Sequence, residues 1–327
     1  MSSVLVFLEI KNLEISRISL EALAAGHALA ASLSLPVDVA VVANPSHPLL
    51  ATISGKAPRT VFAIDNPLLH QYTQEGYSEA YRQLVQKTGA TYVILPHTYQ
   101  VRDFAPRLAT KFNEVLISDV TGFETAEGAG PVFVRQLLQG KLNATYSHTG
   151  SGPCFVSIQA GAFRADEPAG GETTVEPFEP KLDAAQIFTR PGEPFRQSAQ
   201  TVDLSSAPIL VSVGRGIKEE ANLSIVQELA TALGAELSAS RPICDNGWLP
   251  MERQVGSSGQ TVAPKIYFAI GISGAIQHLV GMKGSQCIVA INKDENAPIF
   301  EVADYGIVGD LFEVVPALTA AVRKAKS

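Results

Sequence analysis

The sequence GISGAIQH, Gly271 to His278, joins a strand-like run to a helix-like run in the second half of the chain. The apolar run before it ends at Ile270, and the helix-like run begins at Ala275. A strand, a glycine turn and a helix start present free backbone N–H groups and the positive end of a helix dipole to an anion. The sequence therefore predicts a phosphate or pyrophosphate site at Ser273 and Gly274. The glycine spacing alone is weak support, because many strand-to-helix turns need a glycine.

Outward from this turn, strand-like and helix-like runs alternate in both halves of the chain. Alternation of this kind predicts an α/β fold with a mostly parallel sheet covered on both faces. Only the region from Ile117 to Ile158 reads as β without long helices. Strands are expected at 4–10, 37–42, 60–64, 92–95, 133–138, 144–147, 155–158, 209–213, 236–239, 266–270 and 287–291, and helices at 18–33, 72–87, 104–112, 218–233 and about 316–326.

The stretch ADEPAGGETT, Ala165 to Thr174, has the composition of a loop, and the sequence up to Ala207 reads as irregular and polar. We place a domain boundary near Ser206. The expected organisation is an N-terminal α/β domain with a mostly parallel sheet (1–205), followed by a Rossmann-like, doubly wound domain (206–327). The strands ending at Val213 and Ile270 are both followed by glycine turns, and ligands on such sheets bind at the carboxyl ends of strands.

Composition excludes several classes of protein. The 327 residues carry a formal net charge of −7, with 17% charged residues and no basic block, which argues against nucleic-acid binding. The three cysteines are far apart and form no CxxC pair, and the histidines lack metal-ligand spacing, so no metal site is expected. The first residues read as a strand, so we expect no signal sequence, and no apolar run reaches the ~18 residues that span a bilayer. We expect a soluble, cytoplasmic protein without direct membrane insertion.

A series of longer motifs in the second half is similar to one family. The motifs are VSVGRGIK (Val211 to Lys218), GAELSASRPICDNGWLP (234–250), QVGSSGQTVAP (254–264), GISGAIQH (271–278), INKDENAPIF (291–300), VADYGIVGDL (302–311) and FEVVP (312–316). In this order they closely resemble the FAD domain of the alpha subunit of electron transfer flavoprotein. The first half resembles the same family more diffusely, through FAPRLATKFNEVLISDV (104–120) and LLQGKLNATY (137–146).

The resemblance implies an electron carrier that contains FAD and is not itself an enzyme. It implies a heterodimer with a beta subunit, electrons from acyl-CoA or related dehydrogenases of fatty acid β-oxidation, and a membrane quinone oxidoreductase as acceptor. The second domain would be FAD-binding. The implied binding residues are Arg215, Ser240, Arg241, Val255, Gly256, Ser257, Ser258, Ser273, Gly274, Ala275, Ile276, Gln277, His278, Asn292, Asp310 and Leu311.

Several of these residues have an expected role. Ser273 and Gly274 would hold the pyrophosphate, and Arg215 or the loop near Gly256 would hold phosphate or ribitol oxygens. Asn292 and Asp310 suit the adenosine end. Three residues would tune the flavin ring: Arg241 as a fixed positive charge, His278 at a pyrimidine carbonyl and Ser258 at N5.

The chain departs from the family pattern in its flavin loop, which usually reads QTG followed by lysine and here reads Ser257-Ser258-Gly259-Gln260. Serine keeps the hydroxyl at position 258 but loses a methyl that limits its rotamers.

Taken one at a time, the residues have simpler interpretations. His278 could be a surface or satisfied buried histidine, Arg241 an ion-pair partner and Asp310 a helix N-cap. Two other functions stay open: an NAD-linked Rossmann dehydrogenase, disfavoured because the first turn lacks GxGxxG, and a non-redox nucleotide-binding module. The sequence does not identify the electron donor, nor whether the beta subunit holds AMP or a second FAD.

Overall fold

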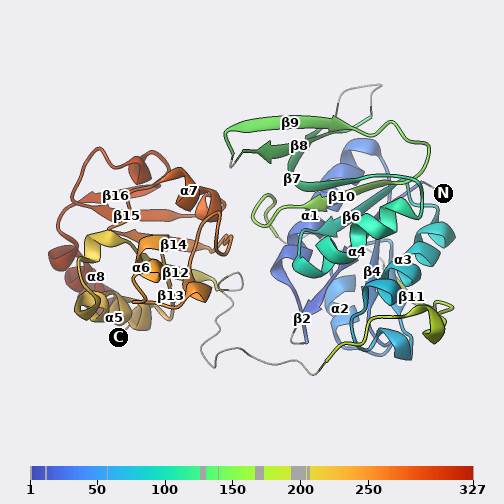
Figure 1. The fold of residues 1–327 in the computed structure, drawn as a ribbon, viewed down its shortest axis with the longest axis horizontal. Coiled ribbons are helices and arrows are strands. Elements are labelled where there is room, and N and C mark those ends of the chain that lie inside the picture. The colour runs from blue at the N-terminus through green and yellow to red at the C-terminus, as the bar shows by residue number, and fades with distance from the viewer. Residues whose placement is uncertain are drawn as a thin grey trace. The chain divides into compact units, whose positions relative to one another are not determined.

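The computed structural model describes residues 2–11, 13–56, 58–125, 130–138, 140–165, 173–192, 204 and 207–326. The chain divides into two compact units, Met1–Pro194 (unit 1) and Phe195–Ser327 (unit 2). The boundary that we predict near Ser206 lies outside the described residues, so it stays a prediction. Both units are α/β, as the alternation of strand-like and helix-like runs indicates (Figure 1).

Unit 1 is built on a nine-stranded sheet with the order β11-β5-β4-β1-β6-β10-β7-β8-β9. The strands from β11 to β7 in this order are parallel, and β8 and β9 are antiparallel. The bounds are β1 (Val4–Leu8), β4 (Val37–Val42), β5 (Thr60–Ile64), β6 (Tyr92–Pro96), β7 (Leu116–Glu124), β8 (Val132–Leu137), β9 (Leu142–Ser147), β10 (Cys154–Ile158) and β11 (Thr174–Phe178), with a small separate pair, β2 (Ile10–Lys11) and β3 (Glu14–Ile15).

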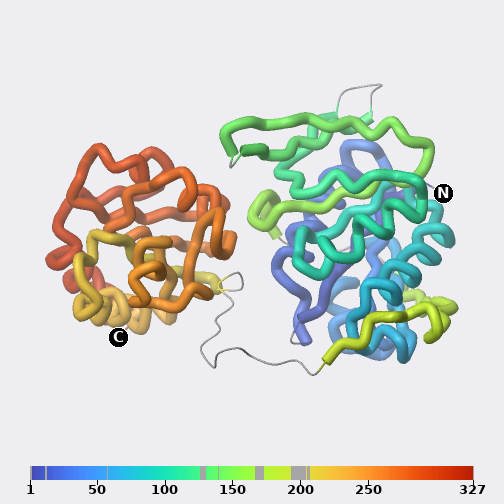
Figure 2. Tube along the Cα trace, viewed as in Figure 1, coloured from blue at the N-terminus to red at the C-terminus, as the bar shows by residue number. Residues whose placement is uncertain are grey.

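Helices cover both faces of this sheet. The helices α1 (Arg17–Leu33) and α2 (Leu49–Ser54) pack on one face, and α3 (Gln74–Thr88) and α4 (Tyr99–Thr110) on the other, which gives two separate apolar cores. Alternate residues of β1 supply the two cores, as expected for a strand buried on both sides. The chain in Figure 2 runs through the green hairpin β8–β9 and returns to β10, which lies between β6 and β7.

Unit 2 has a five-stranded, fully parallel sheet with the order β13-β12-β14-β15-β16. Numbered from β12, this is the order 2-1-3-4-5 of flavodoxin-type doubly wound folds. The bounds are β12 (Ile209–Val213), α5 (Leu223–Leu233), β13 (Glu236–Ala239), α6 (Arg241–Asp245), β14 (Ile266–Ile270), α7 (Ile276–Met282), β15 (Ile288–Asn292), β16 (Tyr305–Val308) and α8 (Leu311–Lys326).

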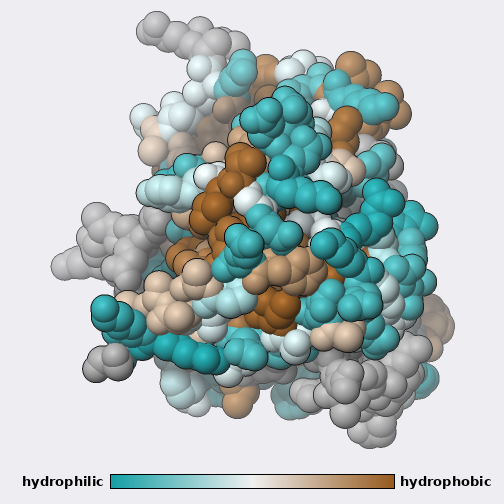
Figure 3. Space-filling view, turned by 90° about the vertical axis from the view of Figure 1, so that its left-hand side faces the viewer, coloured by the Kyte–Doolittle hydropathy of each residue, from teal (hydrophilic) through white to brown (hydrophobic). Residues whose placement is uncertain are grey.

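The sheet of unit 2 is covered on both faces, as the doubly wound prediction requires. Helices α5 and α8 pack together against one face, and α7 with the chain around Val262 covers the other. Val211 and Val213 face the first core, and Leu210 faces the second. Figure 3 views unit 2 from the left-hand side of Figure 1 and shows apolar residues among hydrophilic ones; the exposed apolar side chains of this unit include Tyr305, Ile307 and Val308 of the edge strand β16.

Some elements differ from expectation. Thr174–Phe178 forms β11, a strand that we predicted to be irregular; it lies at an edge of the sheet, where Pro177 costs no ladder hydrogen bond on the open side. β16 was also not predicted. Helix α8 begins at Leu311, before Pro316, and α5 begins at Leu223, later than the expected Lys218. Asp310 explains the earlier start of α8, because its carboxylate accepts the N–H of Phe312 at 2.9 Å.

Candidate cofactor site

The residues predicted to bind the cofactor gather at one edge of the unit 2 sheet. Arg215 follows β12, Ser240 follows β13, Ser273 follows β14 and Asp310 follows β16, while Asn292 is the last residue of β15. All five strands are parallel, so their carboxyl ends share this edge. The chain passes from β12 outward to β13 and then crosses to β14 on the other side of β12. The turns after β12 and β14 therefore form the topological switch point, where sheets of this kind bind ligands.

Glycines allow the two turns at the switch point to touch. The N–H of Gly214 donates to the carbonyl of Ile270 at 2.9 Å, and that of Gly216 to the carbonyl of Gly271 at 3.1 Å. A Cβ on Gly214 would stand 2.4 Å from the Gly271 oxygen, and one on Gly216 would stand 2.7 Å from the Gly271 Cα. The glycines that we read as turn residues are thus needed for backbone packing whatever the ligand.

The turn after β14 offers a row of unused backbone donors. Helix α7 begins at Ile276, one residue later than expected, with Ala275 as its N-cap. Within the described chain, the N–H groups from Ser273 to Gln277 make no hydrogen bond to another backbone group. Ser273, Ala275, Ile276 and Gln277 are exposed. Successive free N–H groups ahead of a helix can bind an anion, as we predicted for this turn.

Gly274 has a structural role besides the predicted one, which stays a prediction. Its φ is +85°, and a Cβ there would stand 2.2 Å from the backbone nitrogen of Ile299. The N–H of Ile299 donates to the Ser273 carbonyl at 3.1 Å, so this turn packs directly against the turn Pro298–Glu301. The lack of a side chain at Gly274 therefore makes room for protein, while its N–H remains available to a ligand.

The loop Val255–Ser258 lies against α7. The N–H of Ser257 donates to the Gln277 carbonyl at 2.7 Å, and a Cβ on Gly281 would stand 2.4 Å from the nitrogen of Gly256. Val255 is buried, whereas Ser257 and Ser258 are exposed. The structure thus brings two predicted binding segments, which are about 15 residues apart in the sequence, into direct contact with each other.

The Ser258 hydroxyl is held by a neighbour that the sequence did not indicate. The side-chain amide of Gln254 donates to the Ser258 Oγ at 2.8 Å. Because Oγ accepts this bond, its own hydrogen stays free to be donated elsewhere. Gln254 is buried, and its Oε1 has no hydrogen-bond partner among the described residues. A polar residue before a glycine-rich loop was the only sequence signal for this contact.

His278 is a buried residue of α7, and the direct flavin contact that we predicted for it stays a prediction. It is 6% exposed, and its Nε2 lies 2.9 Å from the hydroxyl of Tyr267, a fully buried residue of β14. Its Nδ1 is buried and has no hydrogen-bond partner among the described residues. Burial lowers the pKa of His278 to about 4, and the Val255 backbone partly opposes this shift. The ring is therefore neutral near pH 7.

Two of the predicted binding residues, Arg215 and Arg241, are positively charged. Arg241, the first residue of α6, is exposed and pairs with Asp245 one turn later, Nε to Oδ2 at 3.2 Å. Arg215 is exposed, and the described residues include no ion-pair partner for it. Ser240 is nearly buried and ties β13 to β12 through its N–H, which donates to the Val213 carbonyl at 3.0 Å. Both guanidinium groups are available to an anionic ligand.

The three predicted residues at the ends of β15 and β16 are engaged with the protein. The Asn292 amide donates to the Ile272 carbonyl at 2.9 Å and accepts the N–H of Asp294 at 3.0 Å. Asp310 caps α8, as its simpler interpretation proposed. Leu311 is buried in the core beneath α8. Of the three, only Asp310 presents an exposed side chain. Asn292 ties the end of β15 to the turn after β14, and its expected role at the adenosine end stays a prediction.

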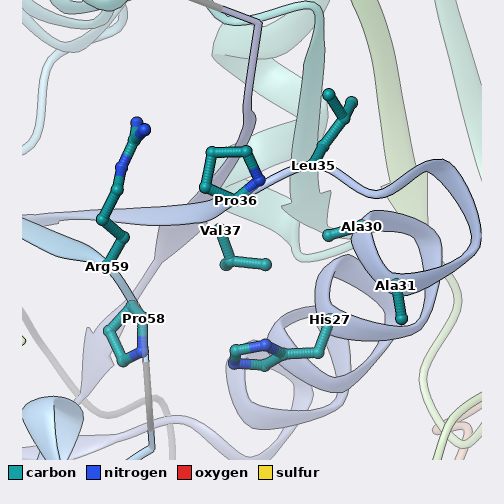
Figure 4. A pocket seen from close by; sticks show the side chains of 8 residues that line it. All are labelled: His27, Ala30, Ala31, Leu35, Pro36, Val37, Pro58 and Arg59. Carbon is teal, nitrogen blue, oxygen red and sulfur yellow. The ribbon is translucent and has the colours of Figure 1, made fainter. Parts of the chain in front are cut away.

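A pocket in unit 1 does not compete with this site. It is lined by His27, Ala30, Ala31, Leu35, Pro36, Val37, Pro58 and Arg59 (Figure 4). The His27 ring bonds to the Lys56 carbonyl at 2.9 Å, and the Arg59 guanidinium pairs with the buried Asp38. Its polar groups are used internally, and it lies where β4 begins, away from the carboxyl ends of the strands. Among the residues that the structure describes, no group of side chains could hold a metal ion. No described helix is long and apolar enough to cross a bilayer.

Comparison with known proteins agrees with this geometry. Residues 4–183 match the electron transfer flavoprotein domain, and residues 203–283 match the electron transfer flavoprotein FAD-binding domain. The chain is 36% identical over 324 residues to the electron transfer flavoprotein subunit alpha of Thermoanaerobacterium thermosaccharolyticum, covering 98% of each chain. It is 38% identical over 317 residues to the same subunit of Bacillus subtilis (97% and 96% covered), and 35% identical over 316 residues to the protein FixB of Clostridium saccharobutylicum (96% and 94% covered).

The two matched domains define a flavoprotein of the electron-transfer class. The chain belongs to the electron transfer flavoprotein family, among its alpha subunits, and its cofactor is FAD. The residues at the switch point fit that group: the free N–H groups from Ser273 to Gln277 and the exposed guanidinium of Arg215 suit a pyrophosphate. When bound, the flavin supplies the redox chemistry, and the protein supplies binding, orientation and charge.

Proposed function

We propose that this chain is the FAD-binding subunit of a heterodimeric electron carrier. Its FAD takes electrons one at a time from an acyl-CoA dehydrogenase or a related dehydrogenase and passes them to a membrane quinone oxidoreductase. The observation that carries this proposal is the row of unused N–H groups from Ser273 to Gln277 at the switch point, in a chain that belongs to the electron transfer flavoproteins.

The exposure of the site supports the need for a partner. Ser257, Ser258, Ser273 and Ile276 are all exposed, and the side chain of Ile276 is 50% accessible although it is apolar. A flavin bound to one wall would keep its other side in water. A beta subunit that covers this side would exclude solvent and complete the site. We therefore expect alpha expressed alone to bind FAD poorly or to aggregate, and co-expression with beta to restore a yellow heterodimer.

A carrier role also fits the chemistry of the side chains around the switch point. The histidine of this region is buried and neutral, and the exposed groups include arginines, serines, backbone amides and the Asp310 carboxylate. The arginines, serines and amides are of kinds that bind anions and tune a flavin, and the Asp310 carboxylate is engaged as the cap of α8. The NAD-linked dehydrogenase is disfavoured further by two features of unit 2. Its sheet has the flavodoxin-type order, and the turn after β12, which reads Gly214-Arg215-Gly216, does not continue into the GxGxxG pattern of dinucleotide-binding turns.

The nucleotide-binding module built on unit 1 is also disfavoured. The switch point of that sheet lies between β1 and β6, and Glu9 follows β1. Burial and, after it, the nearby Glu9 carboxylate raise the pKa of the Tyr77 hydroxyl to about 12. The first turn of α1 is already capped by Ser16, whose hydroxyl accepts the N–H of Ser19. A phosphate would meet an anion and an occupied helix end at this point.

Anaerobic mixing tests the proposal. The co-expressed heterodimer is mixed with an acyl-CoA dehydrogenase and its substrate, and the flavin band is followed by stopped-flow absorbance. We expect substrate-dependent bleaching of the flavin, followed by its return when a membrane quinone oxidoreductase and a quinone are added. Bleaching by NADH in the absence of any partner dehydrogenase would support the rival dehydrogenase instead.

A further inference from the structure

Lys218 has a backbone conformation that residues with a side chain rarely adopt. It follows the 3₁₀ turn Arg215–Ile217 at the switch point, and its φ and ψ are +70° and −50°. The N–H of Glu219 donates to the Ile217 carbonyl at 2.9 Å, so Lys218 is the central residue of a γ-turn of the rare, strained kind. In the described part of unit 2, every other residue with positive φ is a glycine. A lysine at this position therefore indicates that its side chain has a use.

The Lys218 side chain reaches the start of α8. Its Nζ lies 4.7 Å from the centre of the Phe312 ring, which is the distance of a cation–π contact. Phe312 is the second residue of α8, and its N–H is capped by the Asp310 carboxylate. Lys218 is exposed, and among the residues that the structure describes its Nζ has no ion-pair or hydrogen-bond partner. The lysine thus joins the turn after β12 to the helix that follows β16.

Stability alone does not account for a lysine at position 218. An exposed cation–π contact stabilises a fold by less than a backbone conformation of this kind costs. Glycine adopts positive φ without that cost, although it loses more chain entropy on folding. The same edge of the sheet uses glycine for this purpose at Gly271 and Gly274. The Lys218 side chain is therefore better explained by the site than by the fold.

The turn that Lys218 closes carries Arg215. The Arg215 carbonyl accepts the N–H of Lys218 at 3.1 Å, so the two residues are the first and the last of one turn. Ile217 between them is fully buried in the core beneath α8, and the side-chain amide of Asn222 donates to its carbonyl at 2.9 Å. Packing thus fixes the inner side of the turn. The outer side, with Arg215, is exposed, and the contact between Lys218 and Phe312 ties it to α8.

We propose that Lys218 is a positioning residue of the FAD site: its ammonium, held on the Phe312 ring, clamps the turn after β12 to α8 and keeps Arg215 in place for the pyrophosphate. The inference rests on the proposed function and extends it to a residue outside the predicted binding set. A loose turn would have to be ordered when FAD binds, and this ordering would weaken the affinity. Both partners of the contact should therefore matter to FAD binding.

Variants of the co-expressed heterodimer, stripped of flavin and titrated with FAD, test this role. Lys218→Met keeps the length and removes the charge, Lys218→Gly removes the strain and the side chain, and Phe312→Leu removes the ring but keeps an apolar residue. We expect each to weaken FAD binding about threefold to tenfold, as for the loss of one cation–π contact. Lys218→Arg keeps a cation on the ring and should bind FAD like wild type. Lys218→Met combined with Phe312→Leu should lose no more than either alone, because both remove the same contact.

Two of these variants separate positioning from other roles. A lysine that only touched FAD would leave Phe312→Leu with wild-type affinity, and a lysine that only supported the fold would make Lys218→Gly unfold at a lower temperature. We expect Lys218→Gly to unfold no earlier than wild type and still to bind FAD more weakly. Lys87→Met is the matched control, since Lys87 lies over the Phe62 ring at 5.4 Å in unit 1, and it should bind FAD like wild type. Wild-type FAD affinity in Phe312→Leu or in Lys218→Gly would overturn the proposal.

A further measurement needs no flavin. Hydrogen exchange of the peptide 214–222 in the flavin-free heterodimer should be faster in Lys218→Met and Phe312→Leu than in wild type or Lys87→Met, because the clamp is lost. Equal exchange in all of them would overturn the clamp, even if wild type binds no flavin and the proposed function fails. Conversely, a heterodimer that shows the expected FAD affinities but is reduced by no dehydrogenase would contradict the proposed function and support the role of Lys218.

Discussion

Gly216 and Gly271 touch through their backbones at the switch point of unit 2. The Gly216 N–H donates to the Gly271 carbonyl at 3.1 Å, and the Cα of Gly271 occupies the space that a side chain at position 216 would need. This contact locks the turn after β12 to the turn after β14. It fixes the distance between Arg215 and the free N–H groups that follow Gly271, and so the width of the predicted anion site.

The contact predicts a strong effect of one methyl group. Gly216→Ala would place its Cβ 2.7 Å from the Gly271 Cα, so one of the two turns has to move. We expect a loss of about 1–3 kcal/mol in unfolding free energy and a lower FAD content. Thermal unfolding and flavin absorbance check this. Gly122→Ala is the matched control, because no atom lies within 4 Å of its new Cβ; equal behaviour of the two variants would contradict the account.

Arg241 is expected to tune the flavin without contributing much to stability. Its ion pair with Asp245 is exposed on both sides, and pairs of this kind stabilise a fold by no more than about 1 kcal/mol. A fixed cation beside the flavin favours the anionic semiquinone by about 1–3 kcal/mol. Arg241→Ala should therefore lower the first-electron potential and diminish the red semiquinone, and Arg241→Lys should fall between, as spectroelectrochemical titration will show.

Asp245→Asn controls for this effect. It removes the ion-pair partner and keeps the guanidinium, so the potential should stay level or rise slightly. If Arg241→Ala unfolds at a lower temperature but has the wild-type potential, Arg241 is only an ion-pair partner.

The Gln254–Ser258 bond predicts different outcomes at position 258. Ser258→Ala leaves the buried Gln254 amide without its acceptor and removes a hydroxyl from the site, so we expect weaker FAD binding and a loss of about 1–3 kcal/mol in stability. Ser258→Thr keeps the hydroxyl and restricts its rotamers. Its FAD affinity, measured by fluorescence titration, should equal or exceed that of wild type; a loss as large as in the alanine variant would show that the hydroxyl has no role.

The buried histidine of α7, His278, predicts a pH effect on stability. The pKa of His278 is about 4 in the folded chain, below the usual 6.5, so the unfolded chain binds a proton first as pH falls. Stability is then lost as pH falls from about 6.5 to about 4, and His278 contributes up to about 3 kcal/mol of that loss. His27 and His97 shift in the same direction, so the comparison has to isolate His278.

The double variant Tyr267→Phe with His278→Leu provides this comparison, because it removes the titrating ring without leaving an unpaired partner. Denaturant unfolding at pH 7 and at pH 5 should show a smaller loss for the double variant than for wild type. An equal loss in both proteins would mean that His278 titrates normally in the fold.

The strands next to the site could be predicted from the sequence because their signals are local. Ile266 to Ile270 is a short apolar run ended by Gly271, and Glu236 to Ala239 is a short run between Gly234 and Ser240; both match the structure at both ends. The switch-point turns were predictable for the same reason, since glycines follow β12 and β14. The edge strand β16 was missed because its residues are largely exposed and its hydrogen bonds come from β15, far from any local signal.

The side-chain partners in the site could not be predicted because they depend on how the helices and loops pack against the sheet. Tyr267 reads as one more apolar strand residue, and only the packing of α7 on that face of the sheet brings its hydroxyl to His278. Gly274 has the sequence pattern of a ligand turn, yet its missing side chain makes room for Ile299. Sequence motifs identify which segments form the site; the distances between segments decide what each residue does there.

Flavin content of the co-expressed, purified heterodimer tests the central claim most directly. If the carboxyl edge of unit 2 holds the cofactor, the protein is yellow, contains about one FAD for each alpha chain, and passes through a red semiquinone on stepwise reduction. A colourless heterodimer, or one in which the alpha chain carries a nucleotide without flavin, would contradict it.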